Sequence, residues 1–236
     1  MTIVQSSSIL AIIPARGGSK GLPRKNLLPV AGKPLLAWTI EAVQDADAPI
    51  RCVVSTDDDE IAALARDLGT EVVRRPAELA SDESPTELSL LHVLDILQGV
   101  ERAKDVMLLQ ATSPVRLQGT VDRALRTYFE SGVDSLVGVV KNSPFLWRGP
   151  TDRPVPLYDP AHRSRRQDFS VSDLVYRETG SLYVTSVEAL LGSANRISGR
   201  TALFVMDDVE GTDIDSQSDV AEAQRLLGGD FSATGT

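Results

Sequence analysis

The chain has few of the residues that cross-link small proteins or bind transition metals. Its 236 residues include one cysteine, Cys52, and two histidines, His92 and His162. A single cysteine cannot form an intrachain disulfide, which indicates a reducing compartment. Two separated histidines without a second cysteine do not supply the ligands of a zinc site. They also give no sound basis for a Ser-His-Asp hydrolase.

Long hydrophobic runs are absent as well. The apolar run Ile9–Ile13 is far too short to span a bilayer. The residues around it do not have the basic and then long apolar pattern of a signal peptide. With 42% hydrophobic and 24% charged residues, the composition is that of a globular protein. We therefore expect one cytoplasmic α/β domain, residues 1–236, with an insertion.

Positive charge is scarce overall but concentrated locally. The formal net charge is −9, which disfavours nonspecific binding to nucleic acid or to a membrane surface. Binding of a small anionic substrate stays possible, because such binding depends on the charges close to the site rather than on the net charge. The basic residues gather in two clusters, Arg16, Lys20, Arg24, Lys25 and Lys33, and then Arg163, Arg165 and Arg166.

Short β-branched runs alternate with amphipathic stretches along most of the chain. This alternation predicts a three-layer α/β/α fold with a mostly parallel, Rossmann-like sheet. The predicted strands are 9–14, 51–55, 72–73, 106–110, 180–185 and 202–206. The predicted helices are 34–46, 58–68, 85–97, 119–130 and 218–227, with Asp57 or Asp58 as N-cap of the second and Gly69 at its C-terminal end.

The segment at about 143–177 interrupts this alternation. It is rich in proline and arginine and contains five aromatic residues, Phe145, Trp147, Tyr158, Phe169 and Tyr176. A flexible linker seldom carries so many aromatic side chains. We interpret the segment as an inserted arm or lid. Its apolar surface needs a partner, and a second copy of the chain is the expected one. The alternative is that the arm folds back on its own core as a lid.

A glycine-rich basic loop follows the first predicted strand directly. The sequence Pro14–Asn26 contains three glycines, which allow several backbone N–H groups to turn toward one point, and four cationic side chains. Its spacing matches neither the Walker A motif nor the dinucleotide-binding fingerprint. The loop is therefore predicted to hold a polyphosphate in a way that these two motifs do not describe.

This loop resembles the signature of the CMP-sialic acid synthetases, or acylneuraminate cytidylyltransferases. The likeness continues through four further segments in family order: Val54–Asp58, Arg75–Asp82, Leu108–Pro114 and Thr212–Asp215. The resemblance implies transfer of CMP from CTP to the anomeric 2-hydroxyl of a nine-carbon 2-keto sugar acid, with release of pyrophosphate. It also implies a homodimer joined through the inserted arm.

The resemblance assigns the nucleotide half of the site residue by residue. The triphosphate of CTP would be held from the first loop, and the remaining nucleotide contacts would come from later segments. The loop residues are Arg16, Ser19, Lys20 and Lys25, and the others are Asn26, Arg75, Asp82 and Thr86. Gln110 ends a buried strand, where an α/β sheet places ligands, and is predicted to bind a substrate. Thr86 could instead cap a helix, and Gln110 could satisfy loop backbone.

The same resemblance makes Asp213 and Asp215 the ligands of Mg²⁺. The two residues alternate along an extended stretch, so their carboxylates are expected to point the same way. Hard carboxylate oxygens suit Mg²⁺, which usually bridges substrate phosphates and keeps several waters. With Arg16 and Lys25, these two aspartates form the predicted catalytic set. The number of metal ions and the identity of the general base stay open.

Arg166 and Arg177 resemble the arginine pair that binds the sugar-acid carboxylate. A guanidinium fork binds a carboxylate through two hydrogen bonds, as a lysine cannot. This chain departs from the family pattern at three points: the two arginines are eleven positions apart, Thr179 replaces an asparagine, and Ala111 replaces a proline. The departures near the sugar pocket leave the identity of the acceptor open.

Three other functions fit parts of the pattern. One is a cytidylyltransferase for an eight-carbon sugar acid or another 2-keto or phosphonate acid. Another is a metal-dependent glycosyltransferase, since Asp213–Asp215 has the Asp-x-Asp form. The basic loop disfavours this, because a diphosphate donor needs fewer cations. The third, an inactive nucleotide-binding regulator, is disfavoured because all four predicted catalytic residues are present.

Overall fold

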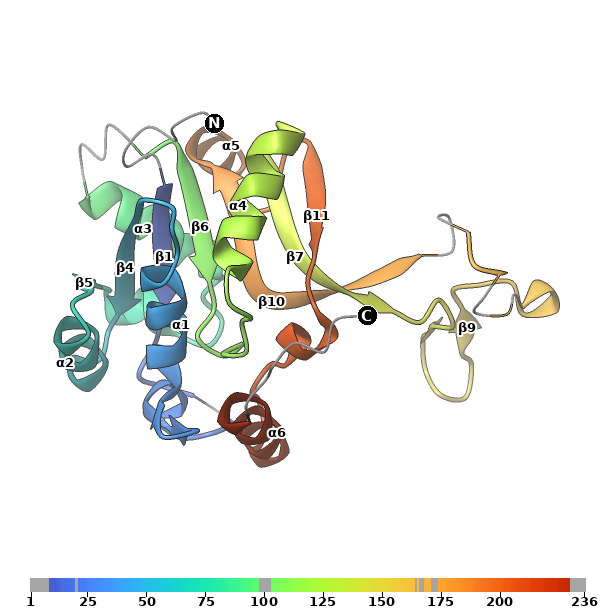
Figure 1. The fold of residues 1–236 in the computed structure, drawn as a ribbon, viewed down its shortest axis with the longest axis horizontal. Coiled ribbons are helices and arrows are strands. Elements are labelled where there is room, and N and C mark those ends of the chain that lie inside the picture. Colours follow the sequence, from blue (N-terminus) through green and yellow to red (C-terminus); the bar gives the residue numbers. More distant parts are fainter. Residues whose placement is uncertain are drawn as a thin grey trace.

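The centre of the molecule is one mixed, mostly parallel sheet (Figure 1). The computed structural model describes residues 9–19, 21–97, 103–163, 165, 168–170 and 174–229. The seven strands run in the order β11-β7-β10-β6-β1-β4-β5, and only β10 is antiparallel to its neighbours. They are β1 Ile9–Pro14, β4 Ile50–Thr56, β5 Glu71–Arg74, β6 Asp105–Leu109, β7 Ser135–Asn142, β10 Val175–Ser186 and β11 Thr201–Val205.

Helices cover both faces of this sheet and complete a three-layer α/β/α fold, as predicted (Figure 1). Helices α1, α2 and α4 pack against one face and α3 and α5 against the other, which separates the core into two apolar clusters. Their bounds are α1 Leu35–Gln44, α2 Asp59–Asp67, α3 Thr86–Ile96, α4 Thr120–Ser131 and α5 Val187–Ser193. A sixth helix, α6 Gln217–Gly228, packs beside a short β2-β3 hairpin, Pro29–Val30 and Lys33–Pro34.

Strand β1 shows how the sequence forms these two clusters. Side chains alternate between the faces of a strand, and every second residue of β1 enters the same cluster. Ile9 and Ile13 pack under α1, α2 and α4, while Leu10 and Ile12 pack under α3 and α5. All four side chains are fully buried, so the run is apolar throughout, as expected for a central parallel strand.

Local capping residues set the ends of α2 as the sequence predicts. Asp58 is the N-cap, and its carboxylate accepts hydrogen bonds from the backbone N–H groups of Glu60 and Ile61. Gly69 lies just beyond the C-cap residue Leu68 and has a φ of +72°. This left-handed conformation suits glycine and ends the helix.

The predicted strands and helices are all present, and within the central sheet and the α-helices two elements were not predicted. The structure adds β7 and the short helix α5, and it extends the strand expected at 180–185 to the whole of β10. Strand β10 begins at Val175 because its first residues pair with the end of β7, as in Val175 with Asn142. Residues 175–177 therefore belong to the sheet rather than to the arm.

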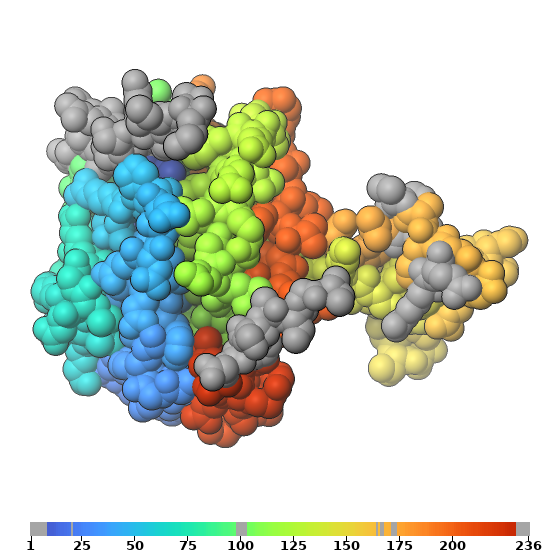
Figure 2. All heavy atoms as spheres, in the orientation of Figure 1, coloured from blue at the N-terminus to red at the C-terminus, as the bar shows by residue number. Residues whose placement is uncertain are grey.

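The arm is the connection between β7 and β10 and stands away from the body of the molecule (Figure 2). Antiparallel neighbours need only a tight turn between them, so a segment of this length is an insertion. It contains a two-stranded ladder, β8 Trp147–Arg148 with β9 Val155–Pro156. The ring of Phe145 lies 5.1 Å from Tyr158 and 5.8 Å from Phe169, centroid to centroid. The arm thus has a small aromatic cluster of its own.

The structure also bears on a membrane span and on a reactive cysteine. Within the described part of the chain, no helix combines the length and the apolar character needed to cross a membrane. Burial in β4 raises the pKa of the Cys52 thiol to about 12. A thiol with that pKa is almost entirely protonated near neutral pH, so Cys52 is a packing residue rather than a nucleophile.

Candidate active site

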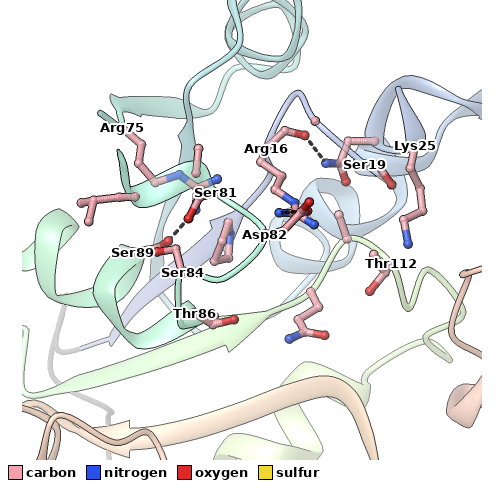
Figure 3. A pocket seen from close by; sticks show the side chains of 17 residues that line it. Arg16, Ser19, Lys25, Arg75, Ser81, Asp82, Ser84, Thr86, Ser89 and Thr112 are labelled. Atoms are coloured by element: carbon pink, nitrogen blue, oxygen red, sulfur yellow. Dashed lines mark hydrogen bonds and ion pairs between the residues drawn. The ribbon is translucent and has the colours of Figure 1, made fainter. Parts of the chain in front are cut away.

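A polar cavity of about 300 Å³ lies at the carboxyl ends of strands β1 and β6 (Figure 3). Parallel sheets place ligand sites at this edge. Eight of the thirteen predicted site residues line the cavity: Arg16, Ser19, Lys25, Asn26, Arg75, Asp82, Thr86 and Gln110. Two others, Lys20 and Arg166, lie outside the described residues.

The loop after β1 is held in place from beneath by Asn26. Its side chain is buried, and its carboxamide donates a 2.9 Å hydrogen bond to the carbonyl oxygen of Arg16. A neighbouring backbone contact joins the N–H of Gly17 to Asp57, at 3.1 Å. An added Cβ at Gly17 would lie 2.5 Å from an oxygen of Asp58, so only glycine fits there. The sequence placed Asn26 near the nucleotide, and its contacts in the structure support the loop.

Arg16 and Asp82 meet across the cavity (Figure 3). Their side chains form an ion pair of 2.6 Å, and each is about one-third exposed, at 34% and 33%. Asp82 follows the 3-10 turn Ala77–Ala80, which forms one wall. The sequence assigned both residues to the nucleotide, whereas the structure pairs them with each other. A phosphate bound at Arg16 would have to compete with the Asp82 carboxylate.

Arg75 forms the other end of the cavity and is buried, with 8% of its surface exposed. Its guanidinium donates to the hydroxyl of Ser89, while its Nε has no hydrogen-bond partner among the described residues. Burial lowers the pKa of Arg75, Asp57 opposes that effect, and Arg16 adds to it. A buried cation with an unused donor favours a ligand that offers an acceptor.

Two serines of this wall were not predicted from the sequence. Ser89 accepts from Arg75, and the buried hydroxyl of Ser84 has no partner in the described part of the chain. Both line the cavity. Isolated serines carry no pattern in sequence, although Ser84 stands in the Asp-Glu-Ser-Pro-Thr stretch beside the predicted Thr86.

Thr86 and Gln110 both face the cavity. The structure shows that Thr86 is not a helix cap, because Pro85 occupies the N-cap position of α3 and Thr86 is its first residue. Gln110 follows the last residue of β6, and its backbone N–H donates to the carbonyl of Ser181. The Gln110 carboxamide has no hydrogen bond among the described residues, which leaves both of its ends available to a ligand.

Asp213 and Asp215 lie beside Lys25 rather than in the cavity lining. Lys25 donates from its ammonium to the carbonyl of Ile214 at 2.6 Å and to the carboxylate of Asp215 at 3.0 Å. Ile214 is fully buried between the two aspartates and fixes the segment against α6. The lysine from the first loop and the acidic segment from the end of the chain are thereby joined.

The two carboxylates differ in environment. Burial raises the pKa of Asp213, the hydroxyls of Thr112 and Ser113 oppose that effect, and the nearby charge of Asp215 adds to it. Ser113 lies 3.2 Å from the Asp213 carboxylate, whereas Asp215 is 79% exposed. The charge of Asp215 beside Asp213 thus makes a pair of carboxylates, a donor set suited to a divalent cation.

Arg177 lies outside the cavity, on β10. Its guanidinium donates to the carbonyl of Gly211 at 3.1 Å and to that of Glu178 at 3.5 Å. Gly211 ends the 3-10 turn Asp208–Gly211, two residues before Asp213. In this position Arg177 contacts the turn that leads into the acidic segment, on the side of the site away from Arg75.

Arg177→Lys is expected to raise the KM for the acceptor roughly tenfold and to change the KM for CTP much less. The reason is that a single ammonium cannot form the two hydrogen bonds of a guanidinium fork. Steady-state kinetics with each substrate varied in turn measures both constants. Arg51→Lys is a matched control, since Arg51 is exposed, pairs with Glu71 and lies near the amino end of β4. A raised KM for CTP with an unchanged KM for the acceptor would show that the assignment of Arg177 to the acceptor is wrong.

The fold and the site together define an α/β protein with a polar cavity at the carboxyl edge of its sheet. A cationic loop and a buried arginine line this cavity, and an acidic pair lies beside Lys25 of that loop. Residues 10–224 match the profile of the protein family described as Cytidylyltransferase. The chain therefore belongs to the cytidylyltransferase family.

Curated relatives and a solved structure agree with this assignment. N-acylneuraminate cytidylyltransferase A from Danio rerio is 36% identical over 231 residues, covering 94% of this chain and 52% of the relative. N-acylneuraminate cytidylyltransferase from Escherichia coli is 30% identical over 217 residues, covering 90% and 50%. The chain thus spans about half the length of these relatives. A CMP:2-keto-3-deoxy-manno-octonic acid synthetase in complex with CTP superposes with a TM-score of 0.69 at 17% identity, covering 94% of this chain and 98% of the other, which supports the fold.

Proposed function

We propose that the protein transfers CMP from CTP to the anomeric 2-hydroxyl of a nine-carbon 2-keto sugar acid of the sialic acid type. The observation that carries the proposal is the polar cavity with Arg16, Lys25 and Arg75, in a chain 36% identical to an N-acylneuraminate cytidylyltransferase over nearly its whole length. The acceptor oxygen bonds to the α-phosphorus, pyrophosphate leaves with the electron pair of the broken bond, and the hydroxyl proton passes to solvent.

The residues of the chain would act on this reaction mainly by position and charge. Arg16 and Lys25 lie on the same loop and would neutralise the triphosphate. Arg75 would contribute its unused donor to the nucleotide from the opposite end of the cavity. Gln110 follows β6 and lines the same cavity, where its carboxamide would orient a substrate toward the phosphate.

Asp213 and Asp215 fit a Mg²⁺ ion, and we propose Mg²⁺ as the cofactor. The chemistry of the donor set supports it: two carboxylates beside a phosphate-binding loop, where Mg²⁺ is commonly held by one or two carboxylates with phosphates and water. No group of three or more acidic, histidine or cysteine residues that could hold a metal occurs in the described ranges. When bound, the ion would neutralise phosphate charge and lower the pKa of a coordinated hydroxyl.

We also propose a homodimer that pairs through the arm, in the cytoplasm. The arm exposes large apolar side chains, with Trp147 and Leu157 each 54% exposed and Val155 47% exposed. It extends away from the body of the molecule (Figure 2), which therefore leaves these side chains uncovered. A two-fold copy of the chain would cover such a surface. The single cysteine is consistent with a reducing compartment.

The enzyme is expected to use CTP in preference to ATP, GTP and UTP, and nine-carbon in preference to eight-carbon 2-keto sugar acids. The resemblance to the N-acylneuraminate enzymes is the basis of this expectation. Pyrophosphate release, measured for each nucleotide and acceptor pair in the presence of Mg²⁺, tests both preferences. Reactions without acceptor control for nucleotide hydrolysis. Equal turnover with UTP, or faster turnover of the eight-carbon acid, would contradict the proposed substrates.

A further inference from the structure

The side chain of Arg116 forms hydrogen bonds with three separate elements, one of which ends just before the cavity-lining residue Gln110. One Nη atom donates to the hydroxyl of Thr39 on α1, at 2.9 Å. The other Nη atom donates to two backbone carbonyls, that of Gln110 at 2.9 Å and that of Ser181 at 2.8 Å. The guanidinium therefore connects a helix, the end of β6 and the middle of β10.

The two carbonyls belong to a place where the sheet is irregular. The pairing of β10 with β7 shifts register between Glu178 and Tyr183, and Gly180 there has a φ of +71°. The Ser181 carbonyl belongs to this bulge, and the Gln110 carbonyl follows the end of β6. Each carbonyl already accepts one backbone N–H at 3.3 Å, and Arg116 adds a shorter hydrogen bond to each oxygen. The hydroxyl of Thr179 supplies a further support by accepting from the N–H of Ser181.

The bulge lies directly against the side chain of Gln110. A Cβ added at Gly180 would lie 2.9 Å from the Gln110 Oε1 atom. The backbone N–H of Gln110 also donates to the carbonyl of Ser181, the same oxygen that Arg116 binds. The position of the cavity-lining carboxamide is thus tied to the peptide groups that Arg116 holds.

Glu210 extends this support toward the acidic segment. It is fully buried and accepts hydrogen bonds from the Leu117 N–H at 2.9 Å, the Thr120 hydroxyl at 2.5 Å and the Asp207 N–H at 3.0 Å. Burial lowers the pKa of Arg116 to about 10, and the charge of Glu210 opposes that effect. Glu210 precedes Asp213 by three residues. The negative charge of Glu210 therefore lies near the positive charge of Arg116 on one side and leads into the acidic segment on the other.

We propose that Arg116 is a positioning residue, which holds the Gln110 peptide and the β10 bulge so that the Gln110 carboxamide faces the acceptor. The assignment of the carboxamide to the acceptor rests on the proposed function. Arg16, Arg75 and Lys25 are held by other partners, namely Asp82, Ser89 and Asp215. Loss of the Arg116 hydrogen bonds therefore affects turnover and leaves CTP binding largely intact.

Arg116→Lys and Arg116→Met test the proposal. Neither side chain can bind Thr39 and two carbonyls at once, because only the planar fork has donors in that arrangement. Tyr128→Phe is the matched control: it removes a buried 2.8 Å hydrogen bond to Asp105, the first residue of β6, at the end of the strand away from Gln110. Melting temperature, CTP affinity without acceptor and kcat with N-acetylneuraminate are measured for all three variants.

Hydrogen exchange supplies a readout that does not depend on activity. In both Arg116 variants the backbone amides of residues 109–113 and 179–182 are expected to exchange at least about tenfold faster, the equivalent of one lost hydrogen bond. Tyr128→Phe is expected to leave those amides unchanged at a comparable loss of melting temperature. In the Arg116 variants kcat is expected to fall at least about tenfold, with the Kd for CTP within about threefold of wild type.

Unchanged exchange at residues 109–113 and 179–182 in Arg116→Lys would overturn the proposal, and so would a wild-type kcat. Equal losses of kcat in Tyr128→Phe and Arg116→Lys would overturn it too, because they would show a general effect of stability. If Arg116→Met does not fold, Arg116→Lys decides the test. If wild-type protein does not use N-acetylneuraminate, the proposed function fails, while the exchange result still decides whether Arg116 holds these peptides.

Discussion

Asp215→Asn is expected to lower turnover by roughly 10²-fold or more while the protein stays folded. The substitution keeps the shape of the side chain and removes the charge that pairs with Lys25 at 3.0 Å and would bind Mg²⁺. Because the Asp215 side chain is 79% exposed, the lost ion pair contributes about 1 kcal/mol or less to the free energy of unfolding. Turnover is measured over a range of Mg²⁺ concentrations, with melting temperature measured alongside.

Asp208→Asn provides the matched control for this effect. Asp208 is exposed and stands on the 3-10 turn just before the acidic segment. It carries the same charge but belongs to no predicted site, so its variant is expected to keep wild-type turnover. If Asp215→Asn kept near wild-type activity at low Mg²⁺, the assignment of the metal to this pair would be wrong.

Replacing Phe145 and Trp147 together by serine is expected to halve the mass of the protein in solution. The wild-type protein is expected at about twice the 25.4 kDa of one chain, and the double variant at the mass of a single chain. The two rings belong to the aromatic cluster of the arm, and Trp147 is 54% exposed in one chain. Their burial against a second arm would be lost. Light scattering at micromolar concentration measures the change.

Leu191→Ser is the control for a general effect of surface polarity. Leu191 is 60% exposed on α5, in the body of the molecule rather than on the arm. Its variant is expected to stay dimeric. A wild-type mass near that of one chain would reject the dimer, and a dimeric Phe145/Trp147 double variant would move the interface away from these rings.

Most of the fold was predicted from local sequence patterns, because the strands and helix ends concerned are determined by residues that are close together in the chain. The apolar run of β1 and the N-cap at Asp58 are of this kind, and both have the predicted form. Strand β7 was missed although its residues 135–140 are all buried, because it continues without a break into the polar start of the arm. The early start of β10 depends on pairing with β7, which no local pattern of residues reveals.

The site residues that the sequence predicts best are those in a motif that contains several charged residues close together in the chain. The loop with Arg16 and Lys25 carries such a pattern, whereas Arg75 was assigned through the family resemblance, and the structure brings these residues to one cavity. Arg116 and Glu210 were missed, because a buried charge is recognised only from the groups that surround it after folding. The ion pair between Arg16 and Asp82 was missed for a similar reason, since the two residues are far apart in sequence.

Phosphorus NMR distinguishes CMP transfer to a nine-carbon 2-keto sugar acid from every other use of CTP. The protein is incubated with CTP, N-acetylneuraminate and Mg²⁺, and both products are followed in the same sample. We expect the three CTP signals to be replaced by one phosphodiester signal and an equimolar amount of pyrophosphate. Consumption of CTP to CDP and phosphate, or no consumption while CTP binds, would contradict this expectation.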